Sequence, residues 1–248
     1  AYAPSELLLG RCEQALRRAG LSVRAEWEEE MMELGQDEIG IWLDESGEGV
    51  RFCDGQGMFT EAENQQLLIW TALKMGVKRV VLPTGMTRSV EQIAQNCAAE
   101  IVRTRSDRAE WMRAMLKEDS IQFRMHFDGI YAAVNVLSQL RASNLTLRGW
   151  QRSMPAVYRR TRSVPVELRE RAQVLRRLAE EVPDADLTDG LRVEKDGGWA
   201  WVNFSEDRSN CRVVSEARDA EFAKELCDFY ATELEKVLKD VHGGASES

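Results

Sequence analysis

The chain has 248 residues, 44% hydrophobic and 30% charged, which is enough apolar material for one large core or several small ones. Its 42 acidic residues outnumber its 33 basic ones, and the net charge of −9 disfavours general nucleic-acid binding and attachment to anionic membranes. No apolar run reaches the roughly 18 residues of a membrane helix. The start Ala1-Tyr2-Ala3-Pro4 lacks the pattern of a secretory signal. We therefore expect a cytoplasmic protein that binds neither nucleic acid nor membrane.

The chain contains five cysteines and two histidines, and neither set forms a metal or catalytic pattern. Because the cysteines are odd in number and widely spaced, we interpret them as reduced core thiols. They are Cys12, Cys53, Cys97, Cys211 and Cys227. His126 and His242 lie far apart in the sequence, which disfavours a zinc site and a Ser-His-Asp triad.

Apolar residues at helical spacing after Ser5, with Gly20 placed for a C-terminal cap, predict a first helix. Alternation predicts strands at 21–25, 39–43 and 50–53, the last two paired with each other. The acidic residues between the first two strands are interpreted as a solvated surface.

Strands and helices then alternate. A capping box at Thr60 and Glu63 predicts a helix that ends near Gly76. The next expected elements are a strand at 78–82, a helix at 89–97, a strand at 100–104, a helix around 111–116, and helices at 128–141 and 146–154. This order is typical of a mainly parallel sheet.

After Pro165 the pattern changes to that of a small α+β domain. The expected elements are a charged helix at 167–181, a hairpin with strands at 191–194 and 199–202, a strand at 211–216 and a helix at 220–241. Trp199 and Trp201 alternate on one strand, so we expect both to pack under the last helix. The arginine-rich stretch at 141–177 is interpreted as a structural connection rather than a phosphate site. The fold class is therefore a mixed-sheet α/β region followed by a small α+β domain.

Four short motifs follow one another in a fixed order. They are G-I-W-L-D-E-S-G-E-G-V-R at 40–51, L-P-T with I-V-R-T between 82 and 104, D-G-I-Y-A-A at 128–133, and D-G-L-R-V with W-A-W-V-N-F-S between 189 and 205. Together they resemble the C-terminal portion of the α-D-phosphohexomutases, the family of phosphomannomutase and phosphoglucomutase. The resemblance assigns residues 1–58 to the end of the family's second domain and residues 59–163 to its third. It assigns residues 164–242 to the fourth domain and 243–248 to a flexible tail.

The first motif resembles the family's metal loop, in which three aspartates hold one Mg²⁺. The matching positions are Asp44, Ser46 and Glu48, and the arginine expected next is Gly49. Mg²⁺ needs oxygen ligands in near-octahedral geometry. Here one ligand has lost its charge and another is one carbon longer. The resemblance therefore implies at most weak magnesium binding.

The substrate-binding loops of the family are altered as well. Its sugar-binding loop, G-E-x-S-G-H, has no intact counterpart in residues 117–128, and His126 receives no role. In the phosphate loop, Ser205 keeps its residue type and Arg208 lies within reach of a ligand, but two new acidic residues oppose a dianion. Ser205 also suits a simple turn. The candidate substrate-phosphate ligands are Ser205, Arg208 and Arg103.

The resemblance and its departures imply a catalytically degenerate phosphohexomutase-like module for regulation, sugar-phosphate sensing or assembly. Mutase chemistry requires a nucleophile, a metal and a phosphate clamp, and the phosphoserine loop is absent from this sequence. Since the chain does not begin with methionine, we expect a fragment of an enzyme. In related architectures such modules follow a sugar-nucleotidyltransferase domain, with mannose-1-phosphate guanylyltransferase as the first candidate. Expected partners are a hexose phosphate, that N-terminal domain or a second copy of the chain.

Two alternatives stay open. The parent protein is an active phosphomannomutase or phosphoglucomutase whose first domain carries the phosphoserine, and the upstream sequence would reveal that loop. Otherwise the module is a scaffold without a small-molecule ligand, which is favoured if side chains fill the pocket around Asp44, Arg103 and Ser205.

Overall fold

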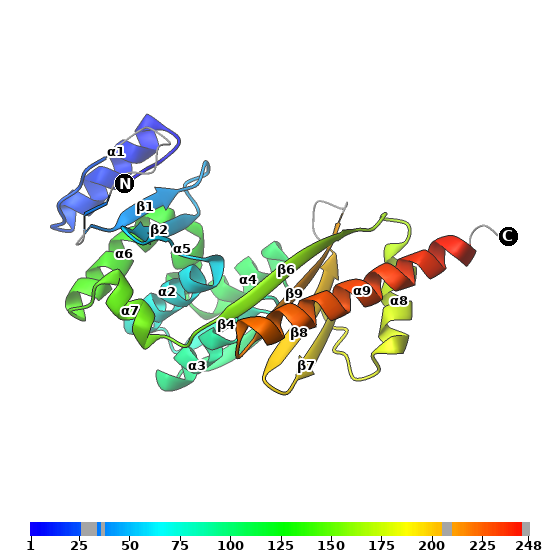
Figure 1. The fold of residues 1–248 in the computed structure, drawn as a ribbon. Coiled ribbons are helices and arrows are strands. Elements are labelled where there is room, and N and C mark those ends of the chain that lie inside the picture. Colours follow the sequence, from blue (N-terminus) through cyan, green and yellow to red (C-terminus); the bar gives the residue numbers. More distant parts are fainter. Residues whose placement is uncertain (26–33, 36–37, 205–209, 245–248) are drawn as a thin grey trace. The chain divides into compact units, whose positions relative to one another are not determined.

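The computed structural model describes residues 1–25, 34–35, 38–204 and 210–244, and the chain forms two compact units (Figure 1). The first unit comprises Ala1–Pro155 and the second Ala156–Ser248. Residues on both sides of position 58 share one hydrophobic core, which includes Leu16, Phe52 and Leu67. The division at residues 58 and 163, which rests on resemblance to the family's domains, therefore stays a prediction. None of the described helices is long and apolar enough to cross a membrane.

The first unit opens with the predicted helix, α1 (Glu6–Arg18), which is capped by the Ser5 hydroxyl accepting from the Leu8 N–H at 3.1 Å. The strand expected at 21–25 is wrong, because Leu21, Val23 and Ala25 pack against the core without joining a sheet. The next strands form an antiparallel sheet of three: β1 (Gly40–Leu43), β2 (Val50–Asp54) and β3 (Gly57–Met58). The predicted pairing of the first two is confirmed. Most of the acidic stretch before β1 lies outside the described residues.

The centre of this core is α2 (Glu61–Lys74), which begins with the predicted capping box between Thr60 and Glu63. Every residue from Gln66 to Leu73 is buried, as expected for a helix enclosed on all sides. The remaining elements of the unit are β4 (Arg79–Pro83), α3 (Ser89–Asn96), β5 (Glu100–Thr104), α4 (Arg108–Glu118), α5 (Ser120–Phe127), α6 (Gly129–Ala142) and α7 (Leu147–Ser153).

The expected mainly parallel sheet is wrong for the described strands, among which β4 and β5 are the parallel pair. The reason lies at Val81 in β4. The Gln122 carboxamide of α5 accepts from the Val81 N–H and donates to its carbonyl, both at 2.8 Å. The Trp111 indole of α4 donates to the same carbonyl at 3.1 Å. Side chains from helices therefore satisfy the backbone groups that a further strand would use.

The second unit is a four-stranded antiparallel sheet in the order β6-β9-β8-β7, packed against a long helix. Its elements are β6 (Tyr158–Pro165), α8 (Arg171–Glu181), β7 (Leu191–Lys195), β8 (Gly198–Phe204), β9 (Asn210–Ala217) and α9 (Ala220–Gly244). The predicted hairpin, third strand and closing helix are confirmed. Strand β6 was not predicted, since Arg159, Arg160 and Arg162 hide its pattern, yet it pairs with β9 over its whole length.

Trp199 and Trp201 do not pack under the last helix, contrary to the sequence expectation. On β8, Ala200 and Val202 belong to the core that contains α9. Because side chains alternate across a strand, the two tryptophans occupy the opposite face, where they cluster with Val214. The Trp201 indole donates to the Asp189 carbonyl.

Candidate functional site

The loop between β1 and β2, residues 44–49, is the candidate metal loop, and it is held by hydrogen bonds within itself. The Ser46 hydroxyl donates to Asp44 Oδ1 at 2.8 Å, and the Gly49 N–H donates to Asp44 Oδ2 at 2.8 Å. The Glu48 N–H donates to the Ser46 hydroxyl oxygen at 3.2 Å. Both carboxylate oxygens of Asp44 therefore already accept hydrogen bonds from their own loop.

The metal loop packs directly on the start of α6. The Gly129 N–H donates to the Gly47 carbonyl at 2.9 Å. A Cβ atom at position 129 would lie 2.9 Å from the carbonyl oxygens of both Gly47 and Gly49, so the close approach requires glycine. Asp128 caps the helix by accepting from the Tyr131 N–H at 2.9 Å. The D-G pair of the third motif thus has a structural reason here: it docks the loop on the helix.

An ion pair joins the metal loop to α4. Glu48 pairs with the Arg108 guanidinium, 60 positions later in the sequence. The same guanidinium lies over the Phe127 ring at 4.7 Å from its centroid. Arg108 was not predicted as a site residue, because its partner is remote in sequence and no motif contains it.

The three family ligand positions, Asp44, Ser46 and Glu48, do not fit a Mg²⁺ site. They supply two carboxylates and one hydroxyl, and each of the three groups is already engaged in the loop or with Arg108. No cluster of three or more His, Cys, Asp or Glu side chains suited to a metal ion occurs among the described residues. Since Mg²⁺ in proteins is often held by one or two carboxylates together with waters, the obstacle here is the competing contacts of these two carboxylates rather than their number.

Arg103, the candidate phosphate ligand of β5, is engaged within its own unit. Its guanidinium forms an ion pair with Glu91 of α3 and lies 3.5 Å from the Pro83 carbonyl. Ser205 and Arg208 lie outside the described residues. The expected joint pocket of Asp44, Arg103 and Ser205 therefore stays a prediction.

The stretch in which the family has its sugar-binding loop contains helix α5 instead. His126 lies on this helix beside Trp111, with ring centroids 4.8 Å apart. Burial lowers the pKa of His126 to about 4, so the imidazole is neutral at physiological pH. Its buried Nε2 atom has no hydrogen-bond partner among the described residues. No element was predicted from the sequence for residues 117–127, so α5 was missed.

The cysteine interpretation is confirmed in part. All five are free thiols, and Cys12, Cys211 and Cys227 are buried, whereas Cys53 and Cys97 are partly exposed. Burial raises the pKa of Cys211 to about 12. A buried thiol of this kind is unreactive and packs as a small apolar residue.

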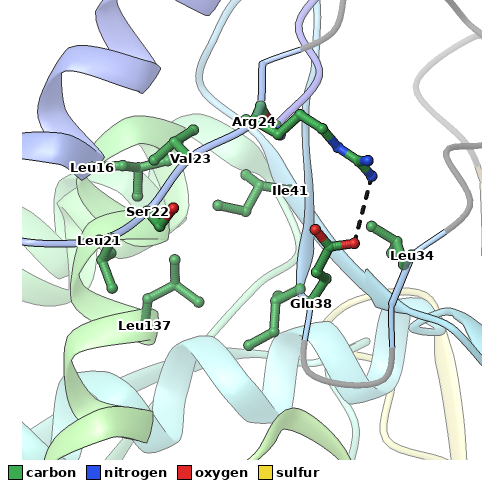
Figure 2. A pocket seen from close by; sticks show the side chains of 11 residues that line it. Leu16, Leu21, Ser22, Val23, Arg24, Leu34, Glu38, Ile41 and Leu137 are labelled. Atoms are coloured by element: carbon green, nitrogen blue, oxygen red, sulfur yellow. Dashed lines mark hydrogen bonds and ion pairs between the residues drawn. The ribbon is translucent and has the colours of Figure 1, made fainter.

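A cavity of about 430 Å³ lies in the first unit between α1, β1 and α6 (Figure 2). Its lining is mainly aliphatic, for example Leu16, Ile41 and Leu137, and Arg24 and Glu38 pair with each other at 3.5 Å on one side. None of the four predicted site residues that the structure describes, Asp44, Ser46, Glu48 and Arg103, lines it. With few polar groups directed into it, this cavity is poorly suited to a sugar phosphate.

No family model matches the chain. It is 25% identical, over 82% of its length, to a probable phosphoglucosamine mutase of Methanopyrus kandleri, of which it covers 49%. The chain spans about half the length of the curated relatives it matches. These relatives are phosphoglucosamine mutases and a phosphoglucomutase/phosphomannomutase.

Solved structures show the same likeness in the fold. A phosphoglucomutase/phosphomannomutase family protein from Burkholderia thailandensis superposes with a TM-score of 0.64 at 14% identity, covering 81% of this chain and 47% of the other. The N-acetylphosphoglucosamine mutase of Aspergillus fumigatus, in complex with GlcNAc-6P and magnesium, gives a TM-score of 0.56 at 14% identity, covering 85% of this chain and 54% of the other. The fold is therefore phosphohexomutase-like.

Proposed function

We propose that this chain is a catalytically degenerate phosphohexomutase-like module, which acts in hexose-phosphate metabolism by ligand binding or assembly rather than by phosphoryl transfer. The observation that carries the proposal is the state of the metal loop. Each Asp44 carboxylate oxygen accepts a hydrogen bond from its own loop, and Glu48 forms an ion pair with Arg108. Phosphoryl transfer depends on positioned cations that offset the charge developing on the phosphoryl oxygens. In this loop a metal cation would have to compete with the Ser46 hydroxyl for Asp44 and with Arg108 for Glu48.

The proposed ligand class is a hexose or hexosamine phosphate. The similar proteins are named for glucosamine, glucose and mannose phosphates, and one similar structure contains GlcNAc-6P. Fold likeness supports the ligand class but not the chemistry, because chemistry resides in the site. The site has lost the carboxylate trio while the surrounding fold is kept.

Calorimetric titration with glucosamine 6-phosphate, glucosamine 1-phosphate and glucose 1,6-bisphosphate tests the proposal, together with a mutase assay on the same preparation. Binding of at least one sugar phosphate without isomerisation is expected. Turnover by the isolated chain would overturn the proposal. Uniform absence of heat would exclude sensing and leave the assembly role, which sedimentation of the full-length protein with and without this module then tests.

The parent protein has two candidate forms. In the first, proposed from the architectures in which such modules occur, the module follows a sugar-nucleotidyltransferase domain of the mannose-1-phosphate guanylyltransferase type and supports it or its oligomers. In the other, the parent is an active mutase whose remaining part carries the phosphoserine. The half-length coverage of the mutase relatives favours this second form. Reading the complete gene separates them, since a nucleotide-binding loop supports the first and a phosphoserine loop the second.

A further inference from the structure

We propose that Arg108 is the resident cation of the metal loop, so that residues 44–49 keep their conformation without any divalent metal. The inference goes beyond the proposed function and does not depend on sugar-phosphate binding. It concerns what neutralises the acidic loop in this protein. One similar structure, the N-acetylphosphoglucosamine mutase of Aspergillus fumigatus, contains magnesium.

The first support is the pair itself. Arg108 comes from α4, the partner Glu48 from the loop, and 60 residues separate them in sequence. A guanidinium is always charged and donates in a fixed planar fork, which suits a carboxylate that must be held in one place. The contact therefore links the loop to α4, with both side chains about half exposed.

The second support is the way the guanidinium is mounted. Arg108 lies over the Phe127 ring, and Phe127 packs edge-on against Trp111 with ring centroids 5.5 Å apart. The Trp111 indole is anchored in turn on the Val81 carbonyl of β4 at 3.1 Å. A cation over an aromatic face is attracted by the ring and loses mobility. The Arg108 guanidinium is thus positioned by Phe127 and Trp111, and Trp111 is in turn hydrogen-bonded to strand β4.

The third support is the place of Arg108 in its helix. It is the first residue of α4, directly after the N-cap Asp107, which accepts from the Glu110 N–H at 2.8 Å. A positive charge at a helix N-terminus is opposed by the helix dipole. Helix stability therefore does not account for an arginine at this position, whereas the contact with Glu48 does.

The rest of the loop is completed without a cation. The Ser46 hydroxyl, which stands where the family has a carboxylate, donates a hydrogen bond to Asp44 and so satisfies the acid instead of adding charge. The Gly49 N–H satisfies the second Asp44 oxygen. One carboxylate is therefore held by two uncharged donors and the other by a guanidinium.

The experiment compares the wild-type chain with Arg108→Gln, using Arg124→Gln as the matched control. Arg124 is similarly exposed, pairs with Asp128 at 3.1 Å and lies 3.6 Å from the Tyr131 ring centroid, and both partners belong to the start of α6 rather than to the loop. Binding of Mn²⁺ is measured by electron paramagnetic resonance, and Tm is measured with millimolar magnesium and with a chelator.

We expect the wild-type Tm to be the same with magnesium and with chelator, and Mn²⁺ to stay free. Because the Arg108–Glu48 pair is about half exposed, Arg108→Gln should lower Tm by at most about 2–3 °C. Part of the loss should be restored by Mn²⁺ or Mg²⁺, which bind the exposed acids. Arg124→Gln should show no metal response. Stoichiometric metal binding by the wild type, or equal metal responses of the two arginine variants, would overturn the inference.

A second pair of variants covers the case in which Arg108→Gln does not fold. Glu48→Gln removes the acid that needs a cation, so its Tm should not respond to metal. Adding Ser46→Asp to Arg108→Gln restores three acids and removes the guanidinium, and this double variant should bind Mn²⁺ at least tenfold more tightly than the wild type. If it binds no better than the wild type, Arg108 is not what keeps the metal out.

Discussion

The two compact units differ in the groups that hydrogen-bond the backbone of their strands. In the second unit, neighbouring strands satisfy one another through a hairpin and long antiparallel ladders, and one helix covers one face. In the first unit, short strands are completed by side chains and loops from distant helices, as with Gln122 on Val81 and Gly129 on Gly47. Local pattern therefore determines much of the second unit, whereas the first depends on individual long-range contacts. Single substitutions should therefore lower the free energy of unfolding more in the first unit than in the second.

The largest effect is expected for Gly129→Ala, in the first unit. The added methyl group would lie 2.7 Å from Leu43 Cδ2 and 2.9 Å from two loop carbonyl oxygens. Because backbone must move, we expect a loss of about 3 kcal/mol or more in the free energy of unfolding, measured by urea titration. Gly10→Ala in α1 is the control, since nothing lies within 4 Å of its added methyl. It should stabilise the protein by about 0.5–1 kcal/mol. Equal effects at both positions would contradict the docking of the loop on α6.

Gln122→Leu should have the next largest effect. It removes the hydrogen-bond partner of the buried Val81 N–H and one of the two donors to the Val81 carbonyl, at a cost of about 2–3 kcal/mol in the free energy of unfolding. Hydrogen exchange of the Val81 amide should accelerate in parallel. The exposed Gln92→Leu in α3 serves as the control and should change stability by less than about 0.5 kcal/mol. Unchanged exchange at Val81 would show that another group satisfies this strand.

Acid should weaken the first unit through His126. In the folded state its pKa is lowered to about 4 by burial, against 6.5 ordinarily, so the unfolded state binds the proton first as pH falls. The free energy of unfolding should therefore decrease from pH 6.5 towards 4, by at most about 1.4 kcal/mol per pH unit. Denaturation of wild type and His126→Phe at several pH values measures this. A wild-type slope that persists in the variant would assign the effect to other groups.

The smallest effect is expected in the second unit, for Arg162→Ala. Arg162 of β6 pairs with Asp228 and Glu235 of α9 at 3.2 and 3.1 Å, but all three side chains are more than 40% exposed. Such pairs contribute below about 1 kcal/mol and are screened by salt. Thermal unfolding at low and high salt should show a small difference that disappears at high salt. If Arg162→Ala lowered the free energy of unfolding as much as Gln122→Leu, the proposed difference between the two units would be wrong.

Elements that carry a local signal could be predicted from the sequence. The capping box of Thr60 and Glu63, the turn at Gly197 with a φ of +85°, and the apolar stripe of α9 were each sufficient to place an element. The misses share one cause. Strand β6 is polar because it is an edge strand, and the Gln122 contact that stops further strand pairing joins residues 41 positions apart. A local sequence pattern cannot predict contacts between residues so far apart in the sequence.

For the candidate site, the metal loop and its loss of charge could be predicted, because Asp44, Ser46 and Glu48 are adjacent in one motif. The role of Arg108 could not, since it depends on how α4 and α5 fold beside the loop. The predicted roles of Arg103, Ser205 and Arg208 stay predictions. Arg103 already has a partner in Glu91, so a ligand at that position would have to compete with a carboxylate.

Strand β6 has a consequence for association between copies of the chain. It is the outermost strand of its sheet and contains Arg159, Arg160 and Arg162 within four residues. If two copies approached edge to edge, these arginines would face their equivalents across the new ladder, and like charges directly opposite one another repel. Pairing of two copies through the β6 edge is therefore disfavoured, and dimers of this protein should form through a surface other than this edge.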